Sequence, residues 1–538
     1  MSIAIFSSVF FTVFATVVMS YISMATPIGP WAELSVVLLA SLIFRLICCR
    51  DCSVQRYNRL TGLTTAAAGV GGIIATVCGF AFPTLYFLDR ELFLNWMQSP
   101  LYFAGIMGGL VLCAGSMSFI LTRWWGVSFL EDDRMPFPIG SMVAKVINAQ
   151  NQLTKSIQLL VGGGLTFVFE AIQKFTVWLP GVVSVFGGAS MGYFQLPAVV
   201  IPLDLAPLFI AIGCVAGAVL TLPLFVGVLS QVFVVNPTHM YFFAHLSKSE
   251  FILAFGCGMV LQGAALGIMK LPGVLVMGVR RLQKFVISSS ATSSRKNEVF
   301  QDKLFTGGAI AALFGVVVFF WLLHFSLLSI LYLAVFATLF SYQLLIIGGK
   351  TGLAPFGRFA TLALLPGLLL FRYTSVEVTL VSVFIGLVGA LSVDLMFGRK
   401  MAQQIGISQR EVELYQLLGL VVSACVVGCT FWLLISHFGL GSQELLAQRA
   451  QARALLVQAA DFDYLVLALG FVFSFLLKFF RVNPTLVFTG LLFNVSFSLL
   501  LILGGIIKVV SGGTDDMDAF WSGIFAAGSI WMIVQAFA

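Results

Sequence analysis

The sequence predicts an all-α polytopic membrane protein of about 16 transmembrane helices in two halves of about eight, with broken or re-entrant helices. Three observations lead to this fold class. The 538 residues are 60% hydrophobic and 9% charged, whereas soluble domains carry about 25% charged residues. The mean hydropathy is +1.05. Apolar segments of about 20 residues, long enough to cross a bilayer as helices, follow one another with short connections.

The first half begins with well-separated apolar segments. They start near residues 2, 31, 62, 100 and 156, and a further one covers residues 251–269. The first block, residues 3–21, has neither a basic n-region nor a clear cleavage pattern. We therefore interpret it as a retained helix and not as a signal peptide.

Residues 182–243 form a crowded region with three apolar pieces. These pieces are interrupted by Pro197, Pro202, Pro207, Pro223 and Pro237. An even number of crossings is needed to keep the orientation consistent, so one piece is predicted to enter and leave on the same side. Broken backbone within a membrane is tolerated only where it is buried in protein or lines a wet cavity. Residues 187–236 are therefore our leading candidate for a substrate path.

In the second half, apolar segments cover residues 304–324, 325–347, 355–371, 376–397, 412–436, 464–480, 484–509 and 519–537. We expect a first transmembrane half at residues 1–287, a cytoplasmic linker at 288–303 and a second transmembrane half at 304–538. Similar halves are typical of duplicated transporters. Short matches between them, such as Val-Asn-Pro-Thr at 235–238 and 482–485, do not establish a repeat.

The basic residues set the expected orientation, because Lys and Arg in short loops stay on the cytoplasmic side. The loop with Arg45, Arg50, Arg56 and Arg59 and the basic segment at 270–303 are assigned to the cytoplasm, which places both termini there. Because basic residues are scattered over loops, the formal charge of +7 does not indicate nucleic-acid binding. Short loops favour a prokaryotic inner membrane.

A charged stretch at residues 131–134 is followed by Pro-Phe-Pro-Ile-Gly at 136–140 and then by a predicted short helix at 141–150. Two prolines two positions apart cannot continue a helix, and Gly140 permits backbone conformations that other residues resist. We place this stretch in a cytoplasmic loop. Its helix is expected either to gate an inner vestibule or to lie at the membrane interface as an amphipathic connector.

Two blocks of the sequence resemble the oligopeptide transporter superfamily, particularly its yellow stripe-like branch and bacterial relatives. The residues that carry this resemblance are Pro136, Phe137, Pro138, Gly140 and Asn148 in the first block, and Asp394, Gly398, Ser408, Arg410 and Gln416 in the second. The sequence departs from the family pattern at Ile139, Met396-Phe397 and Gln409. The resemblance implies a sixteen-helix secondary carrier that moves small peptides or metal chelates, usually with protons.

Ionisable residues in apolar segments are candidates for ion coupling, because a charge at mid-bilayer costs at least ~3 kcal/mol on insertion scales. Glu170 lies one turn before Lys174 within residues 159–179, and is interpreted as a proton-coupling site or as half of a structural ion pair. Asp204 lies between Pro202 and Pro207 and is a second candidate, for coupling or for a substrate amine.

Two further acids have competing interpretations. Glu33 follows Pro30-Trp31 at the start of an apolar segment, so it either caps a helix N-terminus or faces a cavity. Asp394 matches a family position, and the alternative is an ion pair with Arg399 or Arg410, which are near it in sequence.

Uncharged polar residues within apolar segments offer hydrogen bonds to a peptide backbone or a chelate, and the alternative for each is an interhelical contact. These residues are Tyr193, Gln195, Gln262, Tyr342, Gln343 and Asn494. The four histidines have no metal-ligand spacing, so we expect no metal site made by the protein and no cofactor.

The absence of a phosphate-binding loop and of catalytic hydrolase motifs argues against an ATPase or an enzyme. We expect a secondary active transporter that carries small oligopeptides or peptide-like metal chelates by proton-coupled symport and alternating access. The alternatives are an importer of metal–siderophore or metal–nicotianamine-type chelates and an uncoupled channel. Its partners would be the solute, protons or Na⁺, and lipid, and a homo-oligomer is left open.

Overall fold

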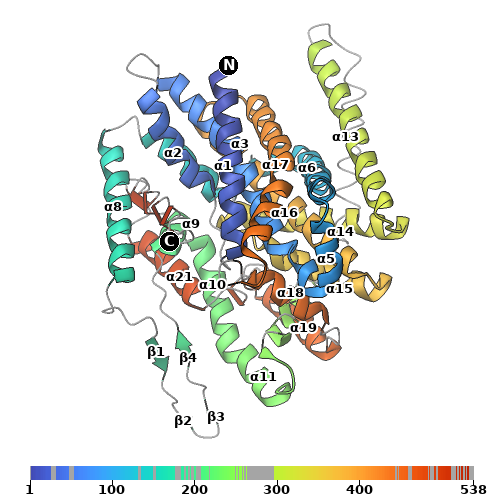
Figure 1. Cartoon of the computed structure of the whole chain (residues 1–538). Helices are drawn as coiled ribbons and strands as arrows, with labels where there is room; N and C mark the ends of the chain where they lie inside the picture. The colour runs from blue at the N-terminus through green and yellow to red at the C-terminus, as the bar shows by residue number, and fades with distance from the viewer. Residues whose placement is uncertain are drawn as a thin grey trace.

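The computed structural model describes most of the chain (Figure 1). The described residues are 2–25, 32–47, 54–130, 135–149, 153–175, 183–186, 190–191, 194–195, 199–201, 207–216, 218–248, 296–442, 447–458, 463–480 and 495–510, together with shorter runs within 250–262, 445 and 482–531.

Seven helical segments among the described residues are long and apolar enough to cross a membrane. Five are the single helices α1 (Ser2–Ala25), α6 (Pro100–Leu130), α14 (Leu327–Thr351), α16 (Ser375–Ile405) and α17 (Gln409–Phe438). Another is α3 (Val54–Ala81) with the short α4 (Thr84–Leu88), and the last is built from α10 (Ala218–Ser230), η1 (Gln231–Val235) and α11 (Asn236–Phe242). The chain is thus an integral, multi-pass membrane protein, and a total near sixteen stays a prediction.

The helices α3 and α16 form the centre of the bundle. In α3, 21 of 28 residues are buried, and in α16, 24 of 31, which fits sequences that are apolar or small on all sides. They run antiparallel, because Gly386 of α16 lies beside Val77 of α3, whereas Gly398 lies beside Ala66. Helix α17 packs closely on α3, where Gly419 faces the carbonyl oxygen of Ala67.

Helix α2 (Ala32–Ile47) begins halfway along α3. Glu33 lies beside Gly69, in the middle of α3, whereas the Tyr57 hydroxyl near the start of α3 donates to the Ser41 carbonyl oxygen over 2.8 Å. The 16 residues of α2 span about 24 Å, less than the roughly 30 Å of a hydrocarbon core. The part of the apolar segment expected from residue 31 that the structure describes is therefore a short helix, which begins inside the bundle and is not long enough for a full crossing.

The short helix after the Pro-Phe-Pro stretch is confirmed as α7 (Pro138–Ala149), and of its two expected positions the one at the membrane interface is wrong. Ten of its residues are buried, including Met142, Val146 and Ile147, so it is not an amphipathic connector at the membrane interface. Gly140 allows the contact with α16 because a side chain there would run into the Phe397 carbonyl oxygen. Phe137, with φ +46°, donates its N–H to the Gly349 carbonyl oxygen over 2.8 Å.

Two runs of six helices have the same order and similar lengths. The first run is α1, α2, α3, α6, α7 and α8 (Leu153–Phe175), with 24, 16, 28, 31, 12 and 23 residues. The second run is α14, α15 (Phe356–Phe371), α16, α17, α18 (Gln448–Gln458) and α19 (Tyr464–Phe479), with 25, 16, 31, 30, 11 and 16 residues. Because the equivalent helices α3 and α16 are antiparallel, the two runs form an inverted repeat. Helices α4 and α5 (Arg90–Met97) are additional to it.

The proline-rich region is irregular where it is described. Strands β1 (Val183–Phe186) and β4 (Val199–Ile201) pair antiparallel, as do β2 (Ser190–Met191) and β3 (Phe194–Gln195), and they project from the helices (Figure 1). After α9 (Pro207–Ala216), the chain continues through α10 (Ala218–Ser230), the π-helix η1 (Gln231–Val235) and α11 (Asn236–Phe242). Pro223 lies within α10. A substrate path here remains a prediction.

Two further helices complete the described fold. Helix α13 (Lys296–Leu322) stands at the side of the bundle beside α6 (Figure 1). Helix α21 (Val495–Val510) packs against α9 and α10, where Gly213 and Gly504 let the backbones meet.

Candidate functional site

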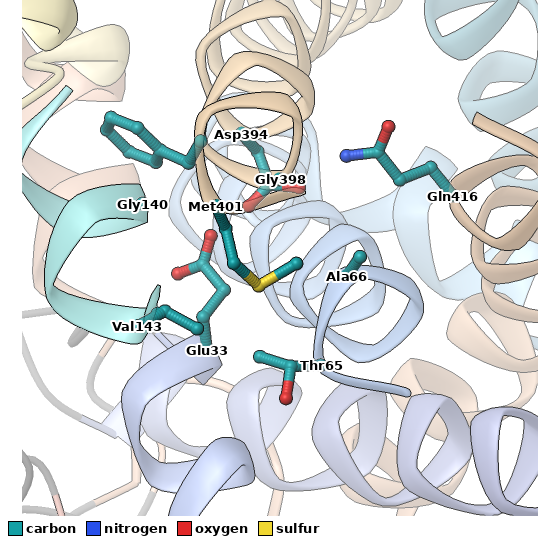
Figure 2. Close-up of a pocket in the computed structure, with 10 residues that line it drawn as sticks. Glu33, Thr65, Ala66, Gly140, Val143, Asp394, Gly398, Met401 and Gln416 are labelled. Carbon is teal, nitrogen blue, oxygen red and sulfur yellow. The ribbon is translucent and has the colours of Figure 1, made fainter. Parts of the chain in front are cut away.

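A small cavity lies between α2, α3, α7, α16 and α17 (Figure 2). It is lined by Glu33, Thr65, Ala66, Gly140, Val143, Asp394, Phe397, Gly398, Met401 and Gln416. The N-terminal end of the short helix α2 and the first turns of α7 therefore meet at the middle of the bundle. Helix ends at mid-bilayer are a common setting for ion and substrate sites in transporters.

Two acidic side chains face each other in this cavity. Glu33 is 6% exposed and Asp394 2% exposed, and Figure 2 shows the Glu33 carboxyl group pointing toward Asp394. The two carboxyl groups are close enough to interact electrostatically. An ionised carboxylate has no proton to donate, so a hydrogen bond between the two groups would require a shared proton. The pair is thus a place where a proton can be bound and released.

The acids have few other partners. Glu33 Oε2 and Asp394 Oδ1 have no hydrogen-bond donor among the described residues. Burying even one unpaired negative charge costs several kcal/mol, so the presence of two acids is not explained by stability. Only these two cavity-lining residues are ionisable.

Gly69 makes room for the pair. A Cβ atom at this position would lie 2.6 Å from Glu33 Cγ and 3.3 Å from Asp394 Oδ1. The run Gly69-Val-Gly-Gly72 marks a packing face in the sequence, but its position beside two acids depends on how α2 and α16 pack. The pattern of residues gave no signal for Thr65, Val143 or Met401.

Four residues of the family-like blocks line the cavity, namely Gly140, Asp394, Gly398 and Gln416. The Gln416 amide is fully buried and donates from Nε2 to the Leu395 carbonyl oxygen over 3.2 Å. This contact depends on Gly398, because a side chain there would collide with Nε2 of Gln416. The glycines therefore bring α7, α16 and α17 together around the acids.

The other family-like residues lie around the cavity and do not line it. Phe137 and Pro138 are buried, and the Phe137 ring packs edge-on to Phe397, with centroids 6.2 Å apart. Pro136, Asn148, Ser408 and Arg410 are exposed, and Ser408 is the residue before α17.

The ion pair considered for Asp394 does not form. Arg399 instead bonds from Nη2 to Glu413 Oε1 over 2.9 Å and from Nη1 to the Thr122 carbonyl oxygen over 3.0 Å. Arg410 is exposed. Asp394 therefore faces Glu33, which belongs to the other half of the chain.

The remaining candidates lie away from this cavity or outside the described residues. Glu170 is half-buried on α8, and Gln343 is half-buried on α14. Gln262 is buried and accepts a hydrogen bond from Ser474 Oγ of α19 over 3.1 Å, which is an interhelical contact. Tyr342 packs against Trp125, with ring centroids 5.1 Å apart. Gln195 belongs to β3, whereas Tyr193, Asp204 and Asn494 lie outside the described residues.

The size of the cavity limits what it can hold. The cavity volume is about 10 Å³, which is close to the minimum for one water molecule. Sites for drug-sized ligands occupy roughly 300–1,000 Å³. In this conformation the cavity can take a proton, a water molecule or a small ion, but it cannot take a peptide.

No curated protein matches the chain. The family model described as OPT oligopeptide transporter protein matches residues 2–531, nearly the whole chain, and so covers both helical repeats and every residue of the cavity. With its multi-pass helical fold and the family-like glycines around its central cavity, the chain belongs to the oligopeptide transporter family, whose members carry peptides or peptide-like solutes.

Proposed function

We propose that this transporter moves small oligopeptides, or peptide-like metal chelates, together with protons, and that Glu33 and Asp394 form the proton-binding site. The observation that carries the proposal is the pair of interacting, buried carboxyl groups in a cavity too small for the solute. A coupling ion needs a site of this size, whereas the solute needs a larger space that opens in another conformation.

The protonation state of the Glu33–Asp394 pair is linked to the distance between α2 and α16. With one shared proton, the Glu33–Asp394 contact holds the start of α2 against the middle of α16. With no proton, two negative charges face each other in a poorly solvated space and repel. Proton binding therefore favours the conformation with α2 and α16 together, and proton release favours their separation.

The inverted repeat supports alternating access as the transport cycle. Two structurally similar halves of opposite orientation can exchange conformations, which opens a central site to one side and then to the other. The short helices α2 and α15, of 16 residues each, are the elements that such an exchange would move. With both termini in the cytoplasm of a prokaryotic inner membrane, transport toward the side of the termini is import.

Uptake into proteoliposomes tests proton coupling. The probe is an equimolar mixture of labelled di- to pentapeptides, offered with an imposed pH gradient that is acidic outside. The wild type is expected to accumulate peptide faster with the gradient, and Glu33→Gln and Asp394→Asn to lose this acceleration. Glu170→Gln, on α8 and away from the cavity, is the matched control and is expected to keep it.

Two results would reject the proposal. Wild-type uptake that ignores the pH gradient would favour a channel, or a sodium-coupled carrier if an imposed Na⁺ gradient restores accumulation. Full acceleration in both acid variants would remove the pair from the coupling mechanism.

A further inference from the structure

The second repeat places other residues at the positions equivalent to those of Glu33 and Val143. Glu33 is the second residue of α2, and Gly357 is the second residue of the equivalent helix α15. Val143, in the wall of the cavity, is the sixth residue of α7, and Arg453 is the sixth residue of the equivalent helix α18. One half thus places an acid opposite an apolar residue, and the other places an arginine opposite a glycine.

The contacts of Arg453 confirm that it lies at this equivalent position. It is 6% exposed and donates from Nη2 to the Gly357 carbonyl oxygen over 3.0 Å. It also donates from Nε to Thr361 Oγ1 over 3.0 Å and from Nη1 to the Phe80 carbonyl oxygen over 3.1 Å. Three hydrogen bonds to α3 and α15 fix the orientation of the guanidinium group.

A second arginine lies one turn earlier on the same face of α18. The Arg449 guanidinium carbon lies 4.0 Å from the centroid of the Phe80 ring, and this side chain is exposed, unlike Arg453. Phe80 is held in turn by stacking on Phe356, the first residue of α15. A guanidinium group that lies flat on an aromatic ring keeps its N–H edges available for a planar anion.

Neither arginine forms an ion pair with a carboxylate among the described residues. Desolvation lowers the pKa of Arg449 to about 10, and burial and then the charge of Arg449 lower the pKa of Arg453 to about 10, so both side chains are still positive at neutral pH. Carbonyl oxygens at the end of α3 offset part of the Arg453 charge. Like charges four residues apart destabilise a helix, so the pair calls for an anion that the described residues do not supply.

We propose that Arg449 and Arg453 form a site for a carboxylate group of the transported solute, with Arg449 as the contact residue and Arg453 as a positioning residue. This inference rests on the proposed function, because the ligand is the solute that the transporter carries. Arg449 can bind a carboxylate through two parallel N–H groups. Peptides and peptide-like chelates share this group, so it serves as a common recognition element.

The test compares peptides that differ only in this group. Purified full-length protein is mixed with equimolar alanine di- to pentapeptides, either as free acids or as C-terminal amides, and the melting temperature is followed over a range of concentration. The free acids are expected to stabilise the wild type at lower concentration than the amides. In Arg449→Gln, the apparent Kd for the free acids is expected to rise about tenfold, as for loss of a charged hydrogen bond.

Two variants control for structural effects. Arg90→Gln removes another exposed arginine that lies over an aromatic ring, 5.4 Å from the centroid of Tyr86, and is expected to bind like the wild type. Arg453→Lys keeps the charge but loses the planar fork, and is expected to weaken free-acid binding without removing it. If Arg453→Lys does not fold, Arg449→Gln still decides the question.

Three outcomes would overturn the inference: free acids and amides bind the wild type equally, neither stabilises it, or Arg449→Gln behaves like Arg90→Gln. Binding is measured without any gradient. Unselective binding combined with pH-driven uptake would therefore reject the carboxylate site alone. Selective binding combined with uptake that ignores pH would reject proton coupling alone.

Discussion

The carboxyl group of Glu33, at the start of the short helix α2, faces that of Asp394 in the interior of α16. The two residues belong to different repeats, so their contact joins the halves of the transporter. Any change that separates them is expected to affect both stability and proton coupling.

Gly69→Ala should separate the two acids. The added Cβ would lie 2.6 Å from Glu33 Cγ, so the side chain of Glu33 must move away from Asp394. Overpacking of this kind typically costs about 1–3 kcal/mol. We expect a lower melting temperature and a loss of pH-driven acceleration in proteoliposome uptake. Gly105→Ala, on α6 with no atom within 4 Å of the added carbon, is the control. Unchanged coupling in Gly69→Ala would show that the pair tolerates displacement.

Gly140→Ala should disrupt the packing of α7 on α16. The added carbon meets the backbone carbonyl of Phe397, which cannot move as a side chain can. We expect a loss of about 2 kcal/mol or more and poor expression of folded protein. The measurement is the melting temperature, with Gly164→Ala on α8 as the control, because open space surrounds that position. Equal stability of the two variants would contradict the close α7–α16 contact.

Glu413→Gln should cost far more stability than Glu411→Gln. Arg399 is 5% exposed and depends on Glu413, so removing that charge leaves a buried cation unpaired, at about 3–5 kcal/mol. Glu411 pairs with Arg59, whose side chain is 59% exposed, and exposed pairs contribute about 0–1 kcal/mol. Denaturation of the two variants side by side checks the difference. A similar loss in both would mean that Arg399 finds another partner.

Stability should fall at alkaline pH through Tyr373, which lies between α15 and α16. Burial, assisted by the negative charge of Glu377, raises the pKa of Tyr373 above its usual value of 10.0, although a hydrogen bond with Ser329 opposes this. The folded protein then holds the phenolic proton more tightly than the unfolded chain, so stability decreases as the pH rises above about 10.

Melting temperatures between pH 8 and pH 11 test this effect. The decline above pH 10 should be smaller in Tyr373→Phe, which has no group to ionise at this position. An identical decline in both proteins would assign the alkaline loss to other residues.

Much of the local structure was predictable, because it depends on composition and on short sequence patterns. The sequence predicted apolar helices, the helix after Pro136-Phe-Pro138, and the family to which the chain belongs. It did not predict that α7 is buried, because the apolar side of a short helix can face lipid or protein equally well. It named Glu33 and Asp394 as separate candidates, and nothing in their spacing indicated that they meet.

The amino-acid sequence alone determined that lipid surrounds this protein, because a chain with so few charges and such long apolar segments cannot be stable in water. It also determined which few ionisable residues would be costly to bury. Only the tertiary structure decided how these residues combine, as with Glu33 against Asp394 and Arg453 against Gly357. Such contacts depend on where the short helices begin and on which glycines let helices approach each other. Both are properties of the packing between segments that are distant in the sequence.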